Sequence, residues 1–490
     1  MADTNRVSLA MVEEATWGTN PGTALSEFNF TGESLNFSID NITSNSIRSD
    51  RQVTDLIQTG AQAAGDINFE LQYATVLSDF MQGALWDDEW HGCGSPDQAT
   101  YTTSGANTIV AAAAGPTMTF AAGFVTLGIN PAIGQQFVIA GSASNNGTHT
   151  VASVVLGATC VITTVGAVTD ETMNSGAETA QFLIKESIVS IAGAGTDDIV
   201  FATAPDTITL GSNIVHDIVA GQWIEVSESG TGVPIGNNAG YHYVTGVVGN
   251  VISVGTTLTA QTYDDDPIAT IKGARIRNGT TENSYWIERA HTDLSEYFSF
   301  EGMVINTMNM TFSANSIATG SFGFIGKTAN LDPANATTGT GTNTAAATTN
   351  FMNAVANVGN IEIDGTAVSG CLIQEISISL NSNVRGLSSI GTLGFCDIGV
   401  GEIALTGNLN LYFVDSTYWD LYKAGTAFTL SWKVEDSAGN AYIFFLPKVK
   451  FSSDTVNAGS KNADVMENTS FQALMDPTLE FTLQVCRVAA

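Results

Sequence analysis

The chain has 490 residues, enough for two to four domains, and 48 acidic against 16 basic residues give it a formal net charge of −32. An acidic chain of this kind repels nucleic acid and anionic membrane surfaces, which argues against stable binding to either. Gly is abundant (49 residues) and Pro is scarce (10 residues), a composition that suits many strands joined by turns.

The cysteines and the N-terminus point to a cytoplasmic folding environment. Five scattered cysteines form no CxxC pair, so we expect reduced, buried thiols. They are Cys93, Cys160, Cys371, Cys396 and Cys486. The N-terminus lacks a charged-then-apolar pattern, so no export signal is expected. Residues 98–169 carry no Asp, Glu, Lys or Arg, but Pro116 and several Gly interrupt them, which argues against a membrane-spanning helix.

The first predicted elements are two alternating strands, 35–40 and 65–71, separated by a long polar loop near 42–63. Each strand has one apolar and one polar face. The apolar residues are Leu35, Phe37, Ile39, Ile67, Phe69 and Leu71, and the polar ones are Asn36, Ser38, Asp40, Asp66, Asn68 and Glu70. A short amphipathic helix follows, with Leu77, Phe80 and Met81 on one face and Gly83 at its expected end.

The middle of the chain contains an internal repeat. Residues 134–164 align with 221–258 through a Gly-Gln pair, an alternating strand, an Asn-Asn turn and two valine-rich strands. This predicts two inserted all-β modules, 106–190 and 196–277, without a helix.

The flanks repeat each other as well. Residues 65–85 align with 407–427 at a constant offset of 342, with Leu409, Leu411 and Phe413 on the strand. Trp419 and Tyr422 lie on the helix, and Gly425 at its end. The matches of 35–41 to 376–382, of 297–312 to 442–451 and of 320–326 to 468–474 extend the repeat. We therefore predict one domain formed by 1–105 and 278–327, a low-complexity bridge over 328–354, and a second domain over 355–490.

Motifs for catalysis and metal binding are weak. The five His residues show no metal-ligand spacing, and there is no GxSxG, Walker A or dinucleotide fingerprint. The acidic stretch 86–93 could hold a metal, but a solvated helix end is the favoured interpretation. We expect no enzyme, no metal and no cofactor.

The flank motifs resemble the major tail tube protein of long-tailed (siphovirus-type) bacteriophages. The resemblance rests on "EEATWGTNP" (13–21), on "TGESL", "IRSDR" and "AAGDINFEL" between 31 and 71, on the stretch 284–327, and on "FLPKVKF" (445–451) and "FQALMD" (471–476). It implies a mainly β protein with two tail-tube-type β-sandwich or half-barrel domains, each with one packed helix. The two small inserted all-β modules then resemble immunoglobulin-like decorations of the outer wall.

The resemblance also implies a function. Copies would join sheet edges into rings, and the rings would stack into the virion's tail tube after assembly in the host bacterial cytoplasm. Double-stranded DNA would pass through the channel without stable binding, and the tape measure protein and the tail terminator and distal tail proteins would be partners. No membrane partner is expected.

Two sets of residues are candidates for this function. Asp40, Asp66, Asn68 and Glu70 could line an acidic channel, and plain surface solubility is the alternative for each carboxylate. The flanks carry −23 of the net charge, because residues 100–277 hold only 13 acidic and 4 basic residues. The implied stacking loops assign inter-ring contacts to Arg48, Asp50, Arg51, Asp55, Arg385 and Asp397, and an ordinary flexible loop is the alternative.

Two tube domains per chain predict that three chains form a ring with pseudo-six-fold symmetry. The alternative is a ring of six chains in which one domain lines the channel. The rival function is a surface-exposed β-repeat adhesin or glycan-binding protein, which would require an export signal.

Overall fold

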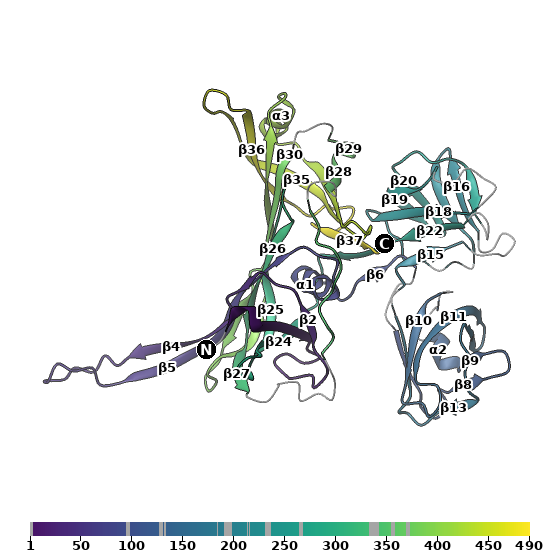
Figure 1. Cartoon of the computed structure of the whole chain (residues 1–490), viewed down its shortest axis with the longest axis horizontal. Helices are drawn as coiled ribbons and strands as arrows, with labels where there is room; N and C mark the ends of the chain where they lie inside the picture. The colour runs from purple at the N-terminus through teal and green to yellow at the C-terminus, as the bar shows by residue number, and fades with distance from the viewer. Residues whose placement is uncertain are drawn as a thin grey trace. The chain divides into compact units, whose positions relative to one another are not determined.

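The computed structural model describes the chain except for residues 1–2, 95–98, 127–130, 132–133, 184, 191–197, 213, 215, 231–236, 264–267, 333–342, 354–357 and 369–372. The chain is mainly β and forms two compact units (Figure 1). Unit 1 contains residues 1–88, 277–484 and 490, and unit 2 contains 89–276 and 485–489.

An antiparallel sheet of eight strands runs through unit 1. Its order is β4-β5-β26-β25-β30-β33-β36-β35. The strands are β4 (Asn36–Thr43), β5 (Leu56–Glu70), β26 (Thr319–Gly326), β25 (Glu296–Ser313), β30 (Ile373–Asn381), β33 (Ala404–Tyr412), β36 (Val465–Ala473) and β35 (Ala441–Ala458).

The sheet consists of two structural repeats of four strands. Repeat 1 contributes β4, β5, β26 and β25, and repeat 2 contributes β30, β33, β36 and β35 in the same order. The β25–β26 and β35–β36 ladders have bulges at corresponding places, and next to them Gly323 pairs with Asp66 while Ser470 pairs with Asn408. This register reproduces the offset of 342 and confirms the predicted alignment of 65–85 with 407–427.

Two predicted alignments are wrong, that of 320–326 with 468–474 by one residue, since Gly323 corresponds to Ser470, and that of 35–41 with 376–382 by two residues. Asn36 pairs with Ala64, and Ser379 pairs with Thr406, which is the counterpart of Ala64. Asn36 therefore corresponds to Ser379. A shift of two leaves every side chain on the same face of the strand, so the alternation could not reveal it.

A second layer covers one face of the sheet. The first halves of β25 and β35 pair with strands of this layer, so each repeat is a sandwich that shares one long strand. In repeat 1 the layer contains β1 (Val7–Glu13), β2 (Ser26–Phe28), β24 (Ser284–His291) and β27 (Thr328–Asp332). In repeat 2 it contains β28 (Val358–Ile363), β29 (Thr366–Ala367) and β34 (Phe428–Glu435). The short segments η1 (Thr4–Arg6) and β3 (Gly32–Glu33) complete repeat 1.

Each repeat has one helix, α1 (Thr75–Leu85) in repeat 1 and α3 (Thr417–Ala424) in repeat 2, and each helix contacts the long strand of its repeat, β25 and β35 respectively. Phe80 of α1 is fully buried and makes edge contacts with the rings of Phe28, Tyr285 and Phe322. Gly83, predicted to end this helix, lies inside it. A Cβ there would overlap the Tyr285 hydroxyl, so glycine permits close packing at this site.

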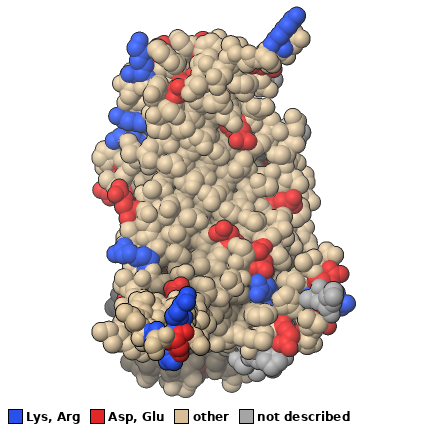
Figure 2. All heavy atoms as spheres, turned by 90° about the vertical axis from the view of Figure 1, so that its left-hand side faces the viewer, with Lys and Arg blue, Asp and Glu red and all other residues tan. Residues whose placement is uncertain are grey.

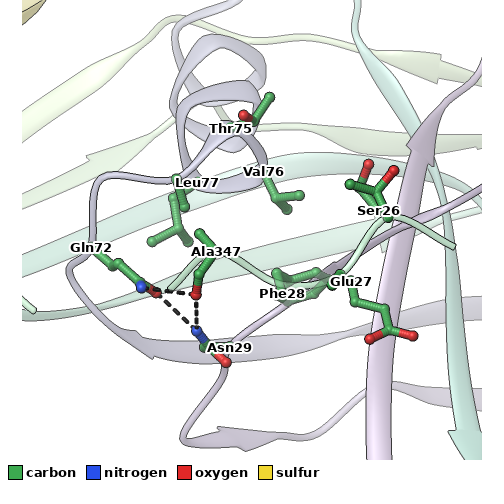
Figure 3. Close-up of a pocket in the computed structure, with 12 residues that line it drawn as sticks. Ser26, Glu27, Phe28, Asn29, Gln72, Thr75, Val76, Leu77 and Ala347 are labelled. Atoms are coloured by element: carbon green, nitrogen blue, oxygen red, sulfur yellow. Dashed lines mark hydrogen bonds between the residues drawn. The ribbon is translucent and has the colours of Figure 1, made fainter. Parts of the chain in front are cut away.

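The segment 343–353, part of the predicted low-complexity bridge, is held along repeat 1. Gln72 Nε2 and Asn29 Nδ2 each donate to Ala347 O at 3.0 Å (Figure 3). Thr349 Oγ1 donates to Tyr73 O at 2.7 Å, and Met352 is fully buried. A pocket of about 260 Å³ remains between this segment and the start of α1.

Unit 2 contains two eight-stranded modules with the same strand order, as expected for a duplication. Module 1 contains β7 (Ala99–Thr102), β8 (Ile109–Ala112), β9 (Thr117–Phe120), β10 (Gln136–Ala140), β11 (Gly147–Leu156), β12 (Cys160–Thr164), β13 (Glu171–Met173) and β14 (Thr179–Phe182). Module 2 contains β15 (Ser187–Val189), β16 (Ile199–Thr203), β17 (Asp206–Leu210), β18 (Trp223–Ser229), β19 (Gly240–Val248), β20 (Val251–Val254), β21 (Gln261–Tyr263) and β22 (Ile268–Lys272). The connecting strands are β6 (His91–Gly92), β23 (Ala274–Arg277) and β37 (Gln484–Val488).

The Asn turn shared by the modules has the same role in both. The side chains of Asn145 and Asn238 each bond both backbone groups of one threonine, Thr169 in module 1 and Thr259 in module 2. The expectation of no helix is wrong for module 1. It contains α2 (Ala122–Thr126), which places Phe124 against the rings of Phe120 and Phe182.

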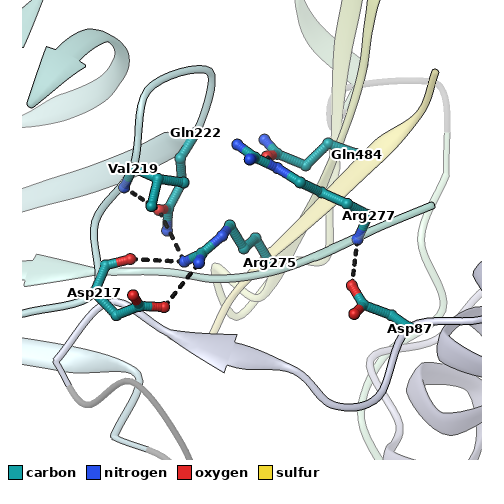
Figure 4. Close-up of polar contacts among 7 residues, drawn as sticks. All are labelled: Asp87, Asp217, Val219, Gln222, Arg275, Arg277 and Gln484. Atoms are coloured by element: carbon teal, nitrogen blue, oxygen red, sulfur yellow. Dashed lines mark hydrogen bonds and ion pairs between the residues drawn. The ribbon is translucent and has the colours of Figure 1, made fainter. Parts of the chain in front are cut away.

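Two arginines, Arg275 and Arg277, lie on either side of the boundary between the units at residues 276 and 277, and each forms hydrogen bonds within its own unit. In unit 2, Arg275 donates to the carbonyl and carboxylate of Asp217, both at 2.7 Å (Figure 4). In unit 1, the Asp87 carboxylate accepts the Arg277 N–H at 2.5 Å, and Arg277 Nε donates to Gln484 at 2.7 Å. The buried Asp87 is thus a structural tie and not part of a solvated helix end.

Candidate assembly surfaces

Two edges of the eight-stranded sheet lack a strand partner among the described residues. β4 pairs only with β5, and residues 453–458 of β35 pair only with β36. The N–H of Ser34 donates to Asp66 O, so the N–H and C=O of Phe37 and Ile39 point away from β5, toward the open edge. An unpaired edge is a template for another strand.

The sheet face opposite the helices is lined mainly by neutral polar side chains. One row crosses six strands through Asn68, Ser321, Asn309, Ser379, Thr406 and Gln472. The next contains Glu70, Thr319, Thr311, Ser377, Asn408 and Ser470. Neighbours in the rows hydrogen-bond, as in Ser379 Oγ to Asn309 Oδ1 at 2.7 Å and Ser470 Oγ to Asn408 Oδ1 at 2.8 Å. The view in Figure 2, toward the side from which the β4–β5 hairpin projects, also shows mainly uncharged residues.

The four channel candidates belong to this polar face. Asp40, Asp66 and Asn68 are exposed, and Glu70 is half-buried. Ile67 and Phe69 on the other face of β5 are buried, and so is Leu71 directly after this strand, as the alternation predicts. The sequence analysis does not predict the neutral rows, although the alternating Ser and Asn residues of 376–382 and 407–410 contain the signal.

The loop predicted at 42–63 is largely a β-hairpin, because β4 extends to Thr43 and β5 begins at Leu56 (Figure 1). At its tip Arg48 and Asp50 form an exposed ion pair of 2.6 Å. The neighbouring Arg48 holds the pKa of the Asp50 carboxyl below its usual range. Arg51 has a left-handed backbone (φ 59°), and the exposed Asp55 accepts the N–H of Leu56.

Repeat 2 has a counterpart hairpin, β31 (Arg385–Ser388) and β32 (Phe395–Gly399). Arg385 is exposed and donates to Val400 O at 3.2 Å, and Asp397 is exposed and accepts the N–H of Ile398. Unlike the free β4–β5 hairpin, this hairpin packs on repeat 1 of its own chain. Val384 and Ile398 are buried in one cluster with Trp86 and Val304.

The two helices differ in burial. Eight residues of α1 are buried, whereas α3 has none. Tyr418 of α3 contacts the ring of Phe451 on β35, but Trp419 and Tyr422 remain 40% and 37% exposed. The exposed Phe413 and Val414 lie just before this helix.

A pair of acidic residues lies near the open edge of β35. Both carboxylate oxygens of Asp454 and Oε1 of Glu467 are shielded from solvent and have no hydrogen-bond partner among the described residues. Burial, with the neighbouring Asp454 carboxylate, raises the pKa of Glu467 to about 7. Burial also raises the pKa of Asp454. The register places Met308 and Gly320 at the equivalent positions of repeat 1, so the acidic pair is specific to repeat 2.

The cysteines only partly follow the prediction. Cys93, Cys160 and Cys486 are buried free thiols, but Cys396 is exposed because it lies on the thin β31–β32 hairpin. Cys371 lies outside the described residues. Within the described part of the chain, no helix is long and apolar enough to cross a membrane.

The sheet of two fused repeats, with one polar face and two open edges, defines the chain as a mainly β structural protein. Residues 4–473 match the family described as phage tail tube protein, and the chain belongs to this family. It is therefore a component of the phage virion. Membership of a structural family suggests a structural and not a catalytic role, and it favours the tail tube over the adhesin alternative. No curated protein matches the chain.

Proposed function

We propose that three copies of this protein close into a ring, and that stacked rings form the tube through which the phage genome reaches the host cell. The observation that carries the proposal is the eight-stranded sheet. It already joins two repeats edge to edge within one chain, and it ends on both sides in an unpaired strand. A heterologous contact that joins two such edges generates a ring when the rotation closes.

The β25–β30 junction inside the chain supplies a template for the contact between copies. There Thr307 pairs with Asn381, and Ser382 N donates to Asn306 O at 2.8 Å. The counterpart of Thr307 in repeat 2 is Ser453, and the counterpart of Asn381 in repeat 1 is Ser38. The same register between two copies therefore pairs Ser453 of one copy with Ser38 of the next. It also directs the N–H of Ile39 to the carbonyl of Ser452. Leu35 needs no partner, since Glu33 accepts its N–H and Arg289 donates to its C=O.

Three copies supply six repeats and 24 strands in one closed sheet, which supports the trimer with pseudo-six-fold symmetry. A ring of six chains would leave one repeat of each chain outside the channel wall. Both repeats have the polar face described above, and it continues without a break across β25 and β30. This continuity favours three copies.

In this ring the polar face would line the channel. Asp40, Asp66, Glu70 and Glu375 would repel phosphates, and no basic residue lies among the residues of the two rows described above. Most of the wall would consist of Asn, Ser and Thr, whose hydrogen bonds are partly satisfied within the rows. We therefore propose a mainly neutral channel with scattered carboxylates, which gives passing DNA little to bind.

The hairpin tips are the proposed contacts between stacked rings. Ile47 on the β4–β5 hairpin and Ile390 on the β31–β32 hairpin are counterparts, and both are fully exposed. Arg48, Asp50, Arg51 and Asp55 surround the first tip, and Arg385 and Asp397 lie on the second hairpin. Opposite charges of this kind fix the register between partners.

The test combines symmetry with a disulfide cross-link. In a background without Cys371 and Cys396, S38C/S453C should give covalent dimers and trimers after oxidation, because the paired Cβ atoms would lie close together. The matched control S38C/N457C shifts one cysteine by four residues and should stay monomeric on a denaturing gel. Cryo-EM of the tubes should show three chains per ring. A ring of six chains, or equal cross-linking of both pairs, would contradict the proposal.

A further inference from the structure

The two repeats share one fold, but they are not equally covered. Helix α1 is buried on several sides, whereas its counterpart α3 leaves Trp419 and Tyr422 in solvent. The hairpins show the converse, since β31–β32 is packed and the β4–β5 hairpin is free. Each exposed surface therefore has a buried counterpart elsewhere in the same chain.

Repeat 2 supplies part of the cover of α1. Tyr442 of β35 stacks on Tyr73, and its hydroxyl hydrogen-bonds Ser78 Oγ at 2.8 Å. Ser382 Oγ donates to Ala84 O at 3.4 Å, in the last turn of α1. Trp86, which caps the helix, packs with Val384 and Ile398. The segment 382–399 thus covers the end of this helix.

In repeat 1 the segment that corresponds to 382–399 belongs to the free β4–β5 hairpin, and we call its part next to the sheet the hairpin root. Arg385 pairs with Gly399, and at the equivalent register Ile42 pairs with Ile57. Residues 382–399 therefore correspond to 39–57. Along this stretch Ile39, Ile42, Leu56 and Ile57 are exposed to solvent. Exposed apolar residues grouped in this way mark an interaction surface.

We infer that the root of the β4–β5 hairpin of one copy docks on the α3 surface of the next copy, as 382–399 docks on α1 within the chain. The α3 surface comprises Phe413, Val414, Trp419, Tyr422 and Val456. This inference rests on the proposed ring and names a second contact in it, distinct from the strand junction.

The apolar character of both surfaces supports this partner. The hairpin root offers branched aliphatic side chains, and the α3 surface offers two valines and three aromatic rings, all at least one-third exposed. The strand junction would bring the two together, because Ile39 lies directly beside the residues of β4 that pair in the proposed register. Within the described part of the chain, the equivalent site at α1 is already filled by 382–399, so it is not open to the hairpin root.

The test places one cysteine on each surface. The contact of Ser382 with Ala84 corresponds to Ile39 against Thr426, and both of these residues are exposed. I39C/T426C, without Cys371 and Cys396, should give covalent dimers and trimers in isolated rings, at least tenfold more than I47C/T426C. The latter is the control because Ile47 lies at the hairpin tip. S38C/S453C reports ring closure separately in the same preparation.

The outcomes separate the two proposals. Cross-linking of both I39C/T426C and S38C/S453C supports docking. Cross-linking of S38C/S453C alone overturns the docking and leaves the ring intact. Cross-linking of I39C/T426C only after rings have stacked into tubes also overturns it, because the hairpin would then contact the next ring. Failure of both pairs removes the proposed ring and the docking with it.

Discussion

Glu467 should make the stability of the isolated chain depend on pH. Its carboxyl is almost fully buried and lies beside the Asp454 carboxylate. In the folded chain burial raises the pKa of Glu467 from 4.5 to about 7, and Asp454 adds to this. The folded state therefore holds a proton that the unfolded chain releases, so stability falls as pH rises from about 4.5 to about 7.

The magnitude follows from the shift. One pKa unit corresponds to 1.36 kcal/mol, and because the two carboxyls share the proton, we expect a loss of about 2–3 kcal/mol across this window. Glu467→Gln keeps the shape and removes the charge. It should leave stability nearly unchanged at pH 5 and raise it by that amount at pH 8. For a unit of this size, the expected gain in Tm is about 3–6 °C.

The assay is differential scanning calorimetry of variant and wild type at pH 5, 6, 7 and 8, at concentrations below assembly. Burial lowers the pKa of His216 and His242, so their contribution has the opposite sign and is lost as pH falls below their unfolded pKa. The difference between variant and wild type cancels it. Glu402→Gln, at an exposed carboxylate of the same repeat, is the control. A pH-independent difference, or a destabilised E467Q at pH 8, would refute the reasoning.

Three further predictions concern packing. Gly83→Ala should destabilise the chain by about 2 kcal/mol in thermal unfolding, because the new Cβ overlaps Tyr285. This loss outweighs the normal preference of Ala for a helix. A neutral result would show that Tyr285 can move. A double-mutant cycle of Ser78→Ala and Tyr442→Phe should show a coupling of about 1 kcal/mol from the buried hydroxyl pair, and additivity would contradict that bond. Under native conditions maleimide should label Cys396 but not Cys93, Cys160 or Cys486, as measured by peptide mass spectrometry. Burial raises the pKa of Cys160 to about 11, so early labelling of this thiol would contradict its burial.

The repeat in the flanks could be predicted because alternation and helix periodicity survive in both copies. The strand–helix unit at 65–85 and its echo at 407–427 align in the structure with the predicted offset. The match between β4 and β30 was displaced by two residues, since a period-2 pattern fits equally well after such a shift.

The candidate sites were less accessible to sequence reasoning. Carboxylates such as Asp66 were recognised as residues of the polar face, but the neutral rows arise only when six strands from both repeats align. The Asp454–Glu467 pair joins neighbouring strands whose register the sequence does not show. The open edges follow from the strand order of the whole sheet, because no local pattern says that β4 and β35 end the same sheet.

The tie between Asp87 and Arg277 has a practical consequence. Where the chain leaves unit 1 after residue 88 and returns at residue 277, both ends are held by one hydrogen bond within unit 1, so we expect changes in the sequence carried between them to be tolerated. The position between residues 88 and 277 is therefore suited to the insertion of another domain. A foreign domain with closely spaced termini could be grafted there, and the repeats would still be free to assemble into a protein nanotube that displays it.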